Sequence, residues 1–283
     1  MTSQTSSRPL RADLTLFAIA TVLLTGAPYV ILLLTGWEVL SGPGLWLFGL
    51  GTSGPSLAAL AVFLFWSRRR RRVARTRVAA PWLWAPAAVV LGILPTVAAN
   101  LLVDPGGFSA DLARAPEVLA GFGGGLLFVV LFLITGPIAE EFGWRGFVQP
   151  RLRLCWTPVR TAVVLGSVWA LWHVPLYFLP GTGQYETGLF TVGGLIFMIT
   201  CIPLSLLYVF VTERLGGKMW AAILIHFAGN AIGAFFPSED PVVLVAQLLI
   251  TVALAAVVLL AWGPARTSRL SPAPPALAGE SRV

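Results

Sequence analysis

Charged residues are scarce in this chain of 283 residues: they make up 11% of it, against about 25% in an ordinary soluble domain. Cysteine and histidine are scarcer still, with two of each. The cysteines, Cys155 and Cys201, lack the C-x-x-C spacing of redox and metal motifs, so we expect both to be ordinary thiols. With 57% hydrophobic residues, this composition excludes an ordinary soluble domain and predicts a polytopic membrane protein.

Long apolar runs fill the chain, and they favour membrane-spanning helices over a barrel. Each run has the roughly 18–24 residues that a ~30 Å hydrocarbon layer requires. The first run has no clear A-x-A cleavage site, so we expect it to stay as a helix. The sequence therefore predicts an all-α polytopic membrane helical bundle of about eight transmembrane helices, at residues 14–37, 43–66, 80–103, 118–141, 160–179, 189–211, 219–236 and 241–262.

Basic residues are distributed unevenly between the apolar runs, which predicts the orientation of the chain. If the N-terminus is cytoplasmic, all of the 19 basic residues except Arg114 fall in cytoplasmic segments. We therefore expect both termini to be cytoplasmic. The net charge of +7 does not indicate nucleic-acid binding, because topology explains the arginine clusters. The five arginines at 68–72 could bind anionic lipid, but we favour a topology anchor.

Glu140 and Glu141 stand side by side at the end of an apolar run, residues 126–139. A carboxylate at membrane depth costs a few kcal/mol at least and is normally kept for function. In a helix, Glu141 and Arg145 are four residues apart and can form an ion pair on one face. Glu140 is turned about 100° away and is free for another role. A plainer interpretation is that both glutamates lie at the membrane interface near a helix end.

The two histidines, His173 and His226, lie in later apolar runs. Trp169 and His173 are four residues apart, which lets the indole pack beside the imidazole. His226 and Asn230 have the same spacing and form a polar stripe on an otherwise apolar helix. A lone histidine in a span is more often a hydrogen bonder between helices than a catalyst. Together with the glutamates, however, the histidines predict one preorganised site built from three spans.

These side chains are typical of a hydrolytic site. A glutamate can act as general base on water, while histidine and asparagine can donate hydrogen bonds to a developing oxyanion. Two histidines and one glutamate also match the ligands of a catalytic zinc, here Glu140, His173 and His226. The H-E-x-x-H signature of zincins is absent, and both mechanisms stay open.

Three motifs, in this order and in separate spans, resemble those of the CPBP intramembrane proteases, which include the CAAX prenyl proteases of type 2 and the bacterial Abi proteins. The motifs are Glu140-Glu141-x-x-x-Arg145, Trp169-x-x-x-His173 and His226-x-x-x-Asn230. The family usually has phenylalanine where this chain has Trp169, which keeps an aromatic neighbour but changes the shape of the pocket.

The resemblance implies an intramembrane endopeptidase with four catalytic side chains. Two activate water and two stabilise the oxyanion, respectively Glu140 with His173 and His226 with Asn230. Three further residues would support the site: Glu141, Arg145 and Trp169. The family has been described both as metalloproteases and as glutamate-dependent proteases, so the resemblance implies either no cofactor or one divalent metal such as zinc.

The implied partners are the lipid bilayer and a membrane-anchored peptide or protein substrate, either prenylated and CAAX-like or bacteriocin-like. The composition points to a multi-pass protein of a bacterial cell membrane. The chain then divides into a cytoplasmic N-terminal segment 1–13, N-terminal transmembrane helices 14–117 with a basic loop 67–79, a CAAX-protease-like catalytic core 118–236, a last transmembrane helix 237–262 and a disordered cytoplasmic tail 263–283.

Three other functions compete with this interpretation. Gly51-Thr52-Ser53-Gly54 fits a rhomboid-like G-x-S-G pattern, with His226 as the base, but that leaves the glutamates and His173 unexplained. A proton-coupled transporter could use an intramembrane relay of glutamate and histidine. A non-catalytic immunity or scaffold membrane protein could keep the same fold without turnover.

Overall fold

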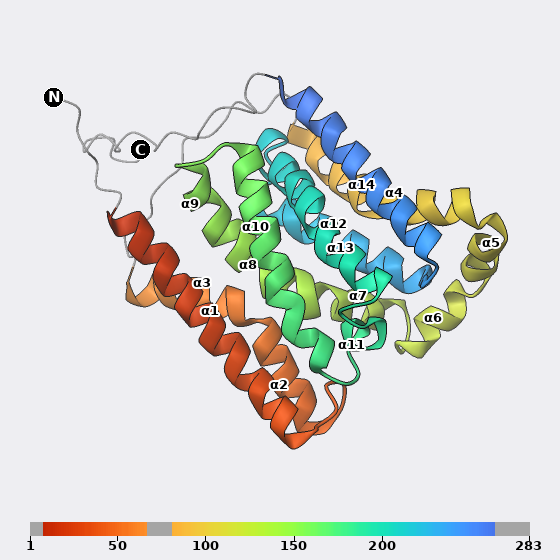
Figure 1. Ribbon diagram of the computed structural model, residues 1–283, viewed down its shortest axis with the longest axis horizontal. Coiled ribbons are helices and arrows are strands. Elements are labelled where there is room, and N and C mark those ends of the chain that lie inside the picture. Colours follow the sequence, from red (N-terminus) through yellow and green to blue (C-terminus); the bar gives the residue numbers. More distant parts are fainter. Residues whose placement is uncertain (1–7, 67–80, 264–283) are drawn as a thin grey trace, which may run out of the picture.

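The computed structural model describes residues 8–66 and 81–263. Within these residues every element is a helix, which confirms the predicted all-α class (Figure 1). The α-helices are α1 (Arg8–Thr35), α2 (Gly42–Thr52), α3 (Gly54–Phe65), α4 (Trp84–Val103), α5 (Pro105–Ala113), α6 (Ala115–Gly121), α7 (Gly125–Leu133), α8 (Ala139–Gly143), α9 (Gln149–Arg153), α10 (Pro158–His173), α11 (Gly183–Thr187), α12 (Val192–Val209), α13 (Lys218–Phe235) and α14 (Pro241–Trp262). Shorter 3₁₀ or π turns are η1 (Pro81–Leu83), η2 (Ile134–Ile138), η3 (Trp144–Val148), η4 (Val174–Phe178) and η5 (Phe210–Arg214).

Six of the described helices are long and apolar enough to cross a membrane, and the pair α2 and α3, bent by 55°, makes a seventh if it counts as one span. The bundle is therefore a polytopic one, while the predicted count of eight and the cytoplasmic termini stay predictions. The remaining predicted span, 219–236, is the 18-residue helix α13. Its apolar character is diluted by Lys218, His226 and Asn230.

The span that carries the two glutamates differs from the predicted 118–141. It runs from Gly125 to Arg153, over 29 residues. It cannot begin earlier as one helix, because Gly123 and Gly124 have φ values of 81° and 105° and break it from α6. As a result Glu140 lies near the middle of this candidate span and not at its end, which argues against the interpretation of these glutamates as residues at a helix end.

The far end of this span is held by polar contacts that the sequence did not reveal. Arg153, a residue that is 1% exposed, pairs through its guanidinium with Glu213 of η5 at 2.9 Å. One turn earlier, the Gln149 side-chain amide donates to the Thr212 hydroxyl at 2.7 Å. Arg151 pairs with Asp13 of α1 at 3.2 Å. Because these partners come from other helices, the chain continues as a packed helix where basic residues had indicated a loop.

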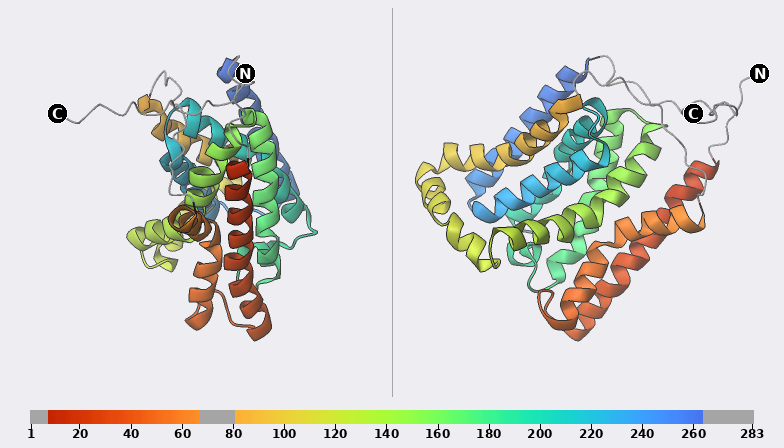
Figure 2. Two further views of the ribbon diagram at one scale, coloured as in Figure 1. Left: turned by 90° about the vertical axis from the view of Figure 1, so that its left-hand side faces the viewer. Right: turned by 180° about the vertical axis from the view of Figure 1, so that it is seen from behind.

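The helix α8 lies at the centre of the bundle. Figure 1 shows α1, α2 and α3 as one group and α4, α12, α13 and α14 as another, with α8 and α10 between them, and the view from behind in Figure 2 agrees. Helix α8 contacts both α3 and α13, and α10 packs along α12. Side chains of α8, α10 and α13 therefore meet inside the bundle.

Two glycines allow this close packing. A Cβ built on Gly143 of α8 would lie 2.5 Å from the backbone carbonyl of Pro55 in α3. A Cβ on Gly92 of α4 would lie 2.6 Å from the carbonyl oxygen of Ile225 in α13. Neither position has room for a side chain. Helices α8 and α13, which carry Glu140 and His226, are thus held by close glycine-to-backbone contacts with α3 and α4 respectively.

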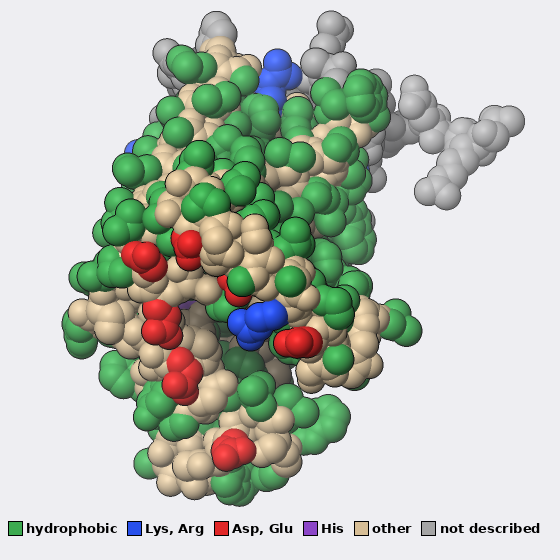
Figure 3. All heavy atoms as spheres, turned by 90° about the vertical axis from the view of Figure 1, so that its right-hand side faces the viewer, with side chains coloured by type: hydrophobic (Ala, Val, Ile, Leu, Met, Phe, Trp, Pro, Cys, Tyr) green, Lys and Arg blue, Asp and Glu red, His purple; other side chains and the backbone are tan. Residues whose placement is uncertain are grey.

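Acidic side chains gather on one face of the molecule, around a hollow in a surface that is otherwise largely apolar (Figure 3). Exposed acidic residues of the segments predicted to be extracytoplasmic are Glu38, Asp104, Glu117, Glu186, Glu239 and Asp240. The basic loop 67–79, nearly all of the tail 263–283 and the first seven residues lie outside the described residues. Cys155 and Cys201 are free thiols, as expected.

Candidate active site

Glu141 is completely buried and forms the predicted ion pair with Arg145 on the same helix face. Its Oε1 lies 3.0 Å from Nη1 of Arg145, and both side chains are 0% exposed. The guanidinium also donates to the Ser205 hydroxyl at 3.2 Å. It lies over the rings of Trp169 and Tyr208, 4.5 Å and 4.1 Å from their centroids. A buried charge needs this degree of compensation, so the supporting role expected of the pair agrees with its contacts.

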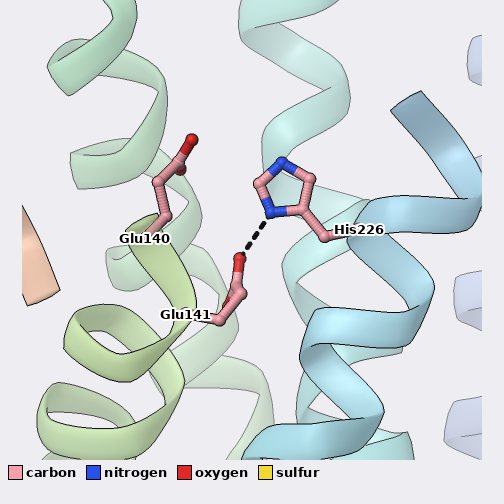
Figure 4. Close-up of side chains that lie close together, drawn as sticks. All are labelled: Glu140, Glu141 and His226. Atoms are coloured by element: carbon pink, nitrogen blue, oxygen red, sulfur yellow. Dashed lines mark hydrogen bonds and ion pairs between the residues drawn. The ribbon is translucent and has the colours of Figure 1, made fainter. Parts of the chain in front are cut away.

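The same carboxylate contacts His226, which sequence spacing did not predict. Nδ1 of His226 lies 2.8 Å from Oε1 of Glu141 (Figure 4). A carboxylate only accepts, so Nδ1 carries the proton and donates. The contact fixes the imidazole with Nε2 directed away from Glu141.

Glu140 has a different set of neighbours. It is 4% exposed, and its Oε2 accepts a hydrogen bond from Nε1 of Trp169 at 2.6 Å. The ion pair of Arg145 goes to Glu141 and not to Glu140. The predicted division between the two adjacent carboxylates is therefore present in the structure: one lies in an ion-pair cluster and the other faces an indole donor.

Trp169 lies between the two histidines. Its ring centroid is 5.3 Å from that of His173 and 5.6 Å from that of His226, both in edge-to-face arrangements. His173 donates from Nδ1 to the Trp169 carbonyl oxygen at 2.7 Å, because a carbonyl can only accept. This leaves Nε2 of His173 with its lone pair. Trp169 connects His173 to Glu140, because its carbonyl accepts from His173 and its indole donates to Glu140.

Polar atoms of Asn230, His226 and Glu140 lie close together against Gly136 in the π turn η2. A Cβ built on Gly136 would lie 3.1 Å from Nδ2 of Asn230, 3.4 Å from Nε2 of His226 and 3.7 Å from Oε1 of Glu140. Three of the four predicted catalytic residues thus direct polar atoms to one place. The fourth, His173, is placed by its ring contact with Trp169.

The residues that come together as candidate metal ligands differ from the expected set. Among the described residues, ligand atoms of Glu140, Glu141 and His226 lie within 4.8 Å of one another, and His173 is not in this group. Oε1 of Glu141 already accepts from Arg145 and from Nδ1 of His226, but Oε2 has no hydrogen-bond partner among the described residues. Glu140, Glu141 and His226 could therefore supply the three protein ligands usual for catalytic zinc. The choice between no cofactor and one divalent metal stays a prediction.

Sequence reasoning missed Gly136, although a signal was present. Gly136 precedes Glu140 by four residues, which puts the two on the same side of a helix. It also precedes Pro137, and a Gly-Pro pair inside an apolar run indicates a local departure from regular helix. The other missed neighbours, Ser205 and Tyr208, come from α12 and carry no local signal.

Two comparisons with known proteins found matches to this chain. Residues 122–232 match the family model described as type II CAAX prenyl endopeptidase Rce1-like. CAAX prenyl protease 2 of Methanococcus maripaludis is 25% identical over 150 residues, which cover 53% of this chain and 52% of that protein. The match therefore spans about half the length of this curated relative.

The fold and the site define an all-α membrane bundle with two glutamates and two histidines buried inside it and an exposed Asn230 beside them. These matches support the CPBP family, as the three motifs led us to expect. The matched segment includes every candidate site residue from Gly136 to Asn230.

Proposed function

We propose that this protein is an intramembrane endopeptidase that hydrolyses peptide bonds of membrane-associated substrates. One observation carries the proposal: Oε1 of Glu140, Nε2 of His226 and Nδ2 of Asn230 all lie within 3.7 Å of the point where a Cβ of Gly136 would stand. A base and two groups able to donate to an oxyanion are what peptide hydrolysis requires at one point. The family match supports the same reaction class.

In the proposed reaction, Glu140 and His173 activate a water molecule. One water proton passes to the carboxylate as the oxygen attacks the peptide carbonyl carbon, and His173 accepts a hydrogen bond from the water at Nε2. The tautomer of His173 suits this role, because Nδ1 donates to the Trp169 carbonyl. When the tetrahedral intermediate collapses, Glu140 returns the proton to the leaving amine.

The carbonyl oxygen becomes an oxyanion that accepts from Nδ2 of Asn230 and from Nε2 of His226. For Nε2 to donate, His226 must be protonated on both nitrogens, since Nδ1 donates to Glu141. A protonated His226 would make the buried cluster of Glu140, Glu141, Arg145 and His226 neutral overall. Such charge balance is the condition under which several charges can share one buried site.

The proposed substrates are membrane-anchored peptides or proteins, either prenylated and CAAX-like or bacteriocin-like, presented from the lipid bilayer. The name of the Methanococcus maripaludis relative points to the first of these classes. The proposed location is a bacterial cell membrane. The candidate spans and the apolar surface support an integral membrane protein, whichever class of substrate it cleaves.

The test is cleavage of a fluorogenic lipidated peptide by the purified protein in detergent. Glu140→Gln is expected to lower kcat by at least about 1000-fold, because the base is lost. Glu186→Gln, which alters an exposed glutamate of α11, is the matched control and should retain full activity. Full cleavage by Glu140→Gln would overturn the mechanism, and an inactive wild-type protein with a full panel of lipidated peptides would favour the non-catalytic alternative.

A further inference from the structure

Gly136 borders the proposed reaction space but has no assigned role. It is buried in the π turn η2, between α7 and α8. Its backbone has ordinary right-handed helical geometry, because it is not among the residues with positive φ in the described chain. Conformational freedom therefore does not explain a glycine here, and alanine would improve helix propensity by up to about 1 kcal/mol.

Its surroundings do explain it. The three atoms nearest to a Cβ at this position are all polar and all belong to proposed catalytic side chains: Nδ2 of Asn230, Nε2 of His226 and Oε1 of Glu140. A methyl group 3.1 Å from the amide nitrogen would be tighter than an ordinary van der Waals contact, and it would stand where hydrogen-bonding partners converge. Gly143, where α8 crosses α3, instead meets the backbone carbonyl of Pro55.

The turn itself is held in place from outside. The Ser56 hydroxyl of α3 donates to the Ile138 carbonyl oxygen at 3.1 Å, and Pro137 removes one backbone donor from the helix. π turns inside α-helices frequently occur at functional sites. The turn thus sets the side of the helix on which the Gly136 Cα faces Asn230 and His226.

We propose that Gly136 is a positioning residue for the reaction, whose lack of a side chain lets Glu140, His226 and Asn230 bring their polar atoms together against the turn η2. This inference rests on the proposed function. It implies that one methyl group at Gly136 pushes the amide of Asn230 and the imidazole of His226 away from their positions beside Glu140. The effect is steric and local, since the helix geometry accepts alanine.

The test compares Gly136→Ala with Gly26→Ala. Gly26 lies in the long helix α1, and a Cβ there would meet nothing within 4 Å, so it is a matched control for a glycine-to-alanine change in a membrane helix. Gly136→Ala is expected to unfold at or above the wild-type temperature while its kcat falls by about 100-fold or more. KM for the lipidated peptide should change little, because the rest of the peptide binds elsewhere.

Equal kcat in Gly136→Ala and wild type would overturn the inference and leave the proposed function standing. A second measurement does not depend on turnover: high-resolution structures of both proteins should show Nδ2 of Asn230 and Nε2 of His226 displaced from Gly136 in Gly136→Ala relative to wild type. If wild type cleaves no peptide but these side chains are displaced, the proposed function fails and the positioning role of Gly136 holds. Unchanged side-chain positions in Gly136→Ala would sink the positioning role.

Discussion

His226 and Glu141 are joined by a hydrogen bond of 2.8 Å between α13 and α8, and the accepting oxygen is the one that also pairs with Arg145. This oxygen therefore orients the imidazole and anchors the guanidinium at once. The second oxygen of Glu141, Oε2, has no hydrogen-bond partner among the described residues. Glu141 is thus the carboxylate on which the geometry of the site depends, while Glu140 is the one directed to the reaction space.

The first prediction separates the two glutamates by stability. Glu141→Gln should lower the free energy of unfolding by about 3–5 kcal/mol, because it leaves the buried Arg145 without its counter-charge. Glu140→Gln should cost about 1 kcal/mol or less, since it alters one hydrogen bond with Trp169 and no ion pair with Arg145. Thermal unfolding of the purified variants in one detergent measures the difference. Equal destabilisation by the two changes would contradict the division of roles.

The second prediction concerns the indole of Trp169. Trp169→Phe keeps an aromatic ring beside His173 and His226 but removes the Nε1 donor to Glu140. A hydrogen bond to a charged group contributes about 1.5–3 kcal/mol, so kcat should fall by about tenfold or more with little change in KM. The family resemblance implies that phenylalanine still supports a working site, and Trp169→Ala should lose far more. A Trp169→Phe variant with wild-type kcat would show that this hydrogen bond does not position Glu140.

The third prediction is that chelation leaves peptide cleavage intact. Oε1 of Glu141 is occupied by Arg145 and His226, and the proposed reaction uses Glu140 and His173 to activate water without a metal. Incubation with EDTA or 1,10-phenanthroline, followed by desalting, should preserve kcat within about twofold. Loss of activity that returns with stoichiometric Zn²⁺ would instead show that Glu140, Glu141 and His226 hold a metal.

Helix spacing predicted the local contacts of the site well. The pair Glu141 and Arg145 and the ring contact of Trp169 with His173 are both four residues apart, and an unbroken helical turn fixes such neighbours. The all-α class followed from apolar runs whose length is set by the bilayer. These features depend on short stretches of sequence alone.

Contacts between helices were not predictable in the same way. The hydrogen bonds from His226 to Glu141 and from Trp169 to Glu140 join residues 85 and 29 positions apart. They depend on how α8, α10 and α13 pack, which local spacing does not encode. The predicted end of the glutamate-bearing span was wrong for the same reason. In the sequence Arg153 indicates a loop, and its buried partner Glu213 comes from a helix that is distant in the sequence.

The last prediction tests the serine-protease alternative. Ser53 lies at the 55° bend between α2 and α3, where its backbone N–H donates to Gly49. A serine nucleophile would need His226 as its base. In the structure, however, His226 donates from Nδ1 to Glu141 and directs Nε2 to the space beside Gly136. Ser53→Ala should therefore keep kcat within about twofold of wild type, and a fluorophosphonate probe should not label the protein. Loss of cleavage in Ser53→Ala together with labelling of wild type would replace the glutamate mechanism by a serine one.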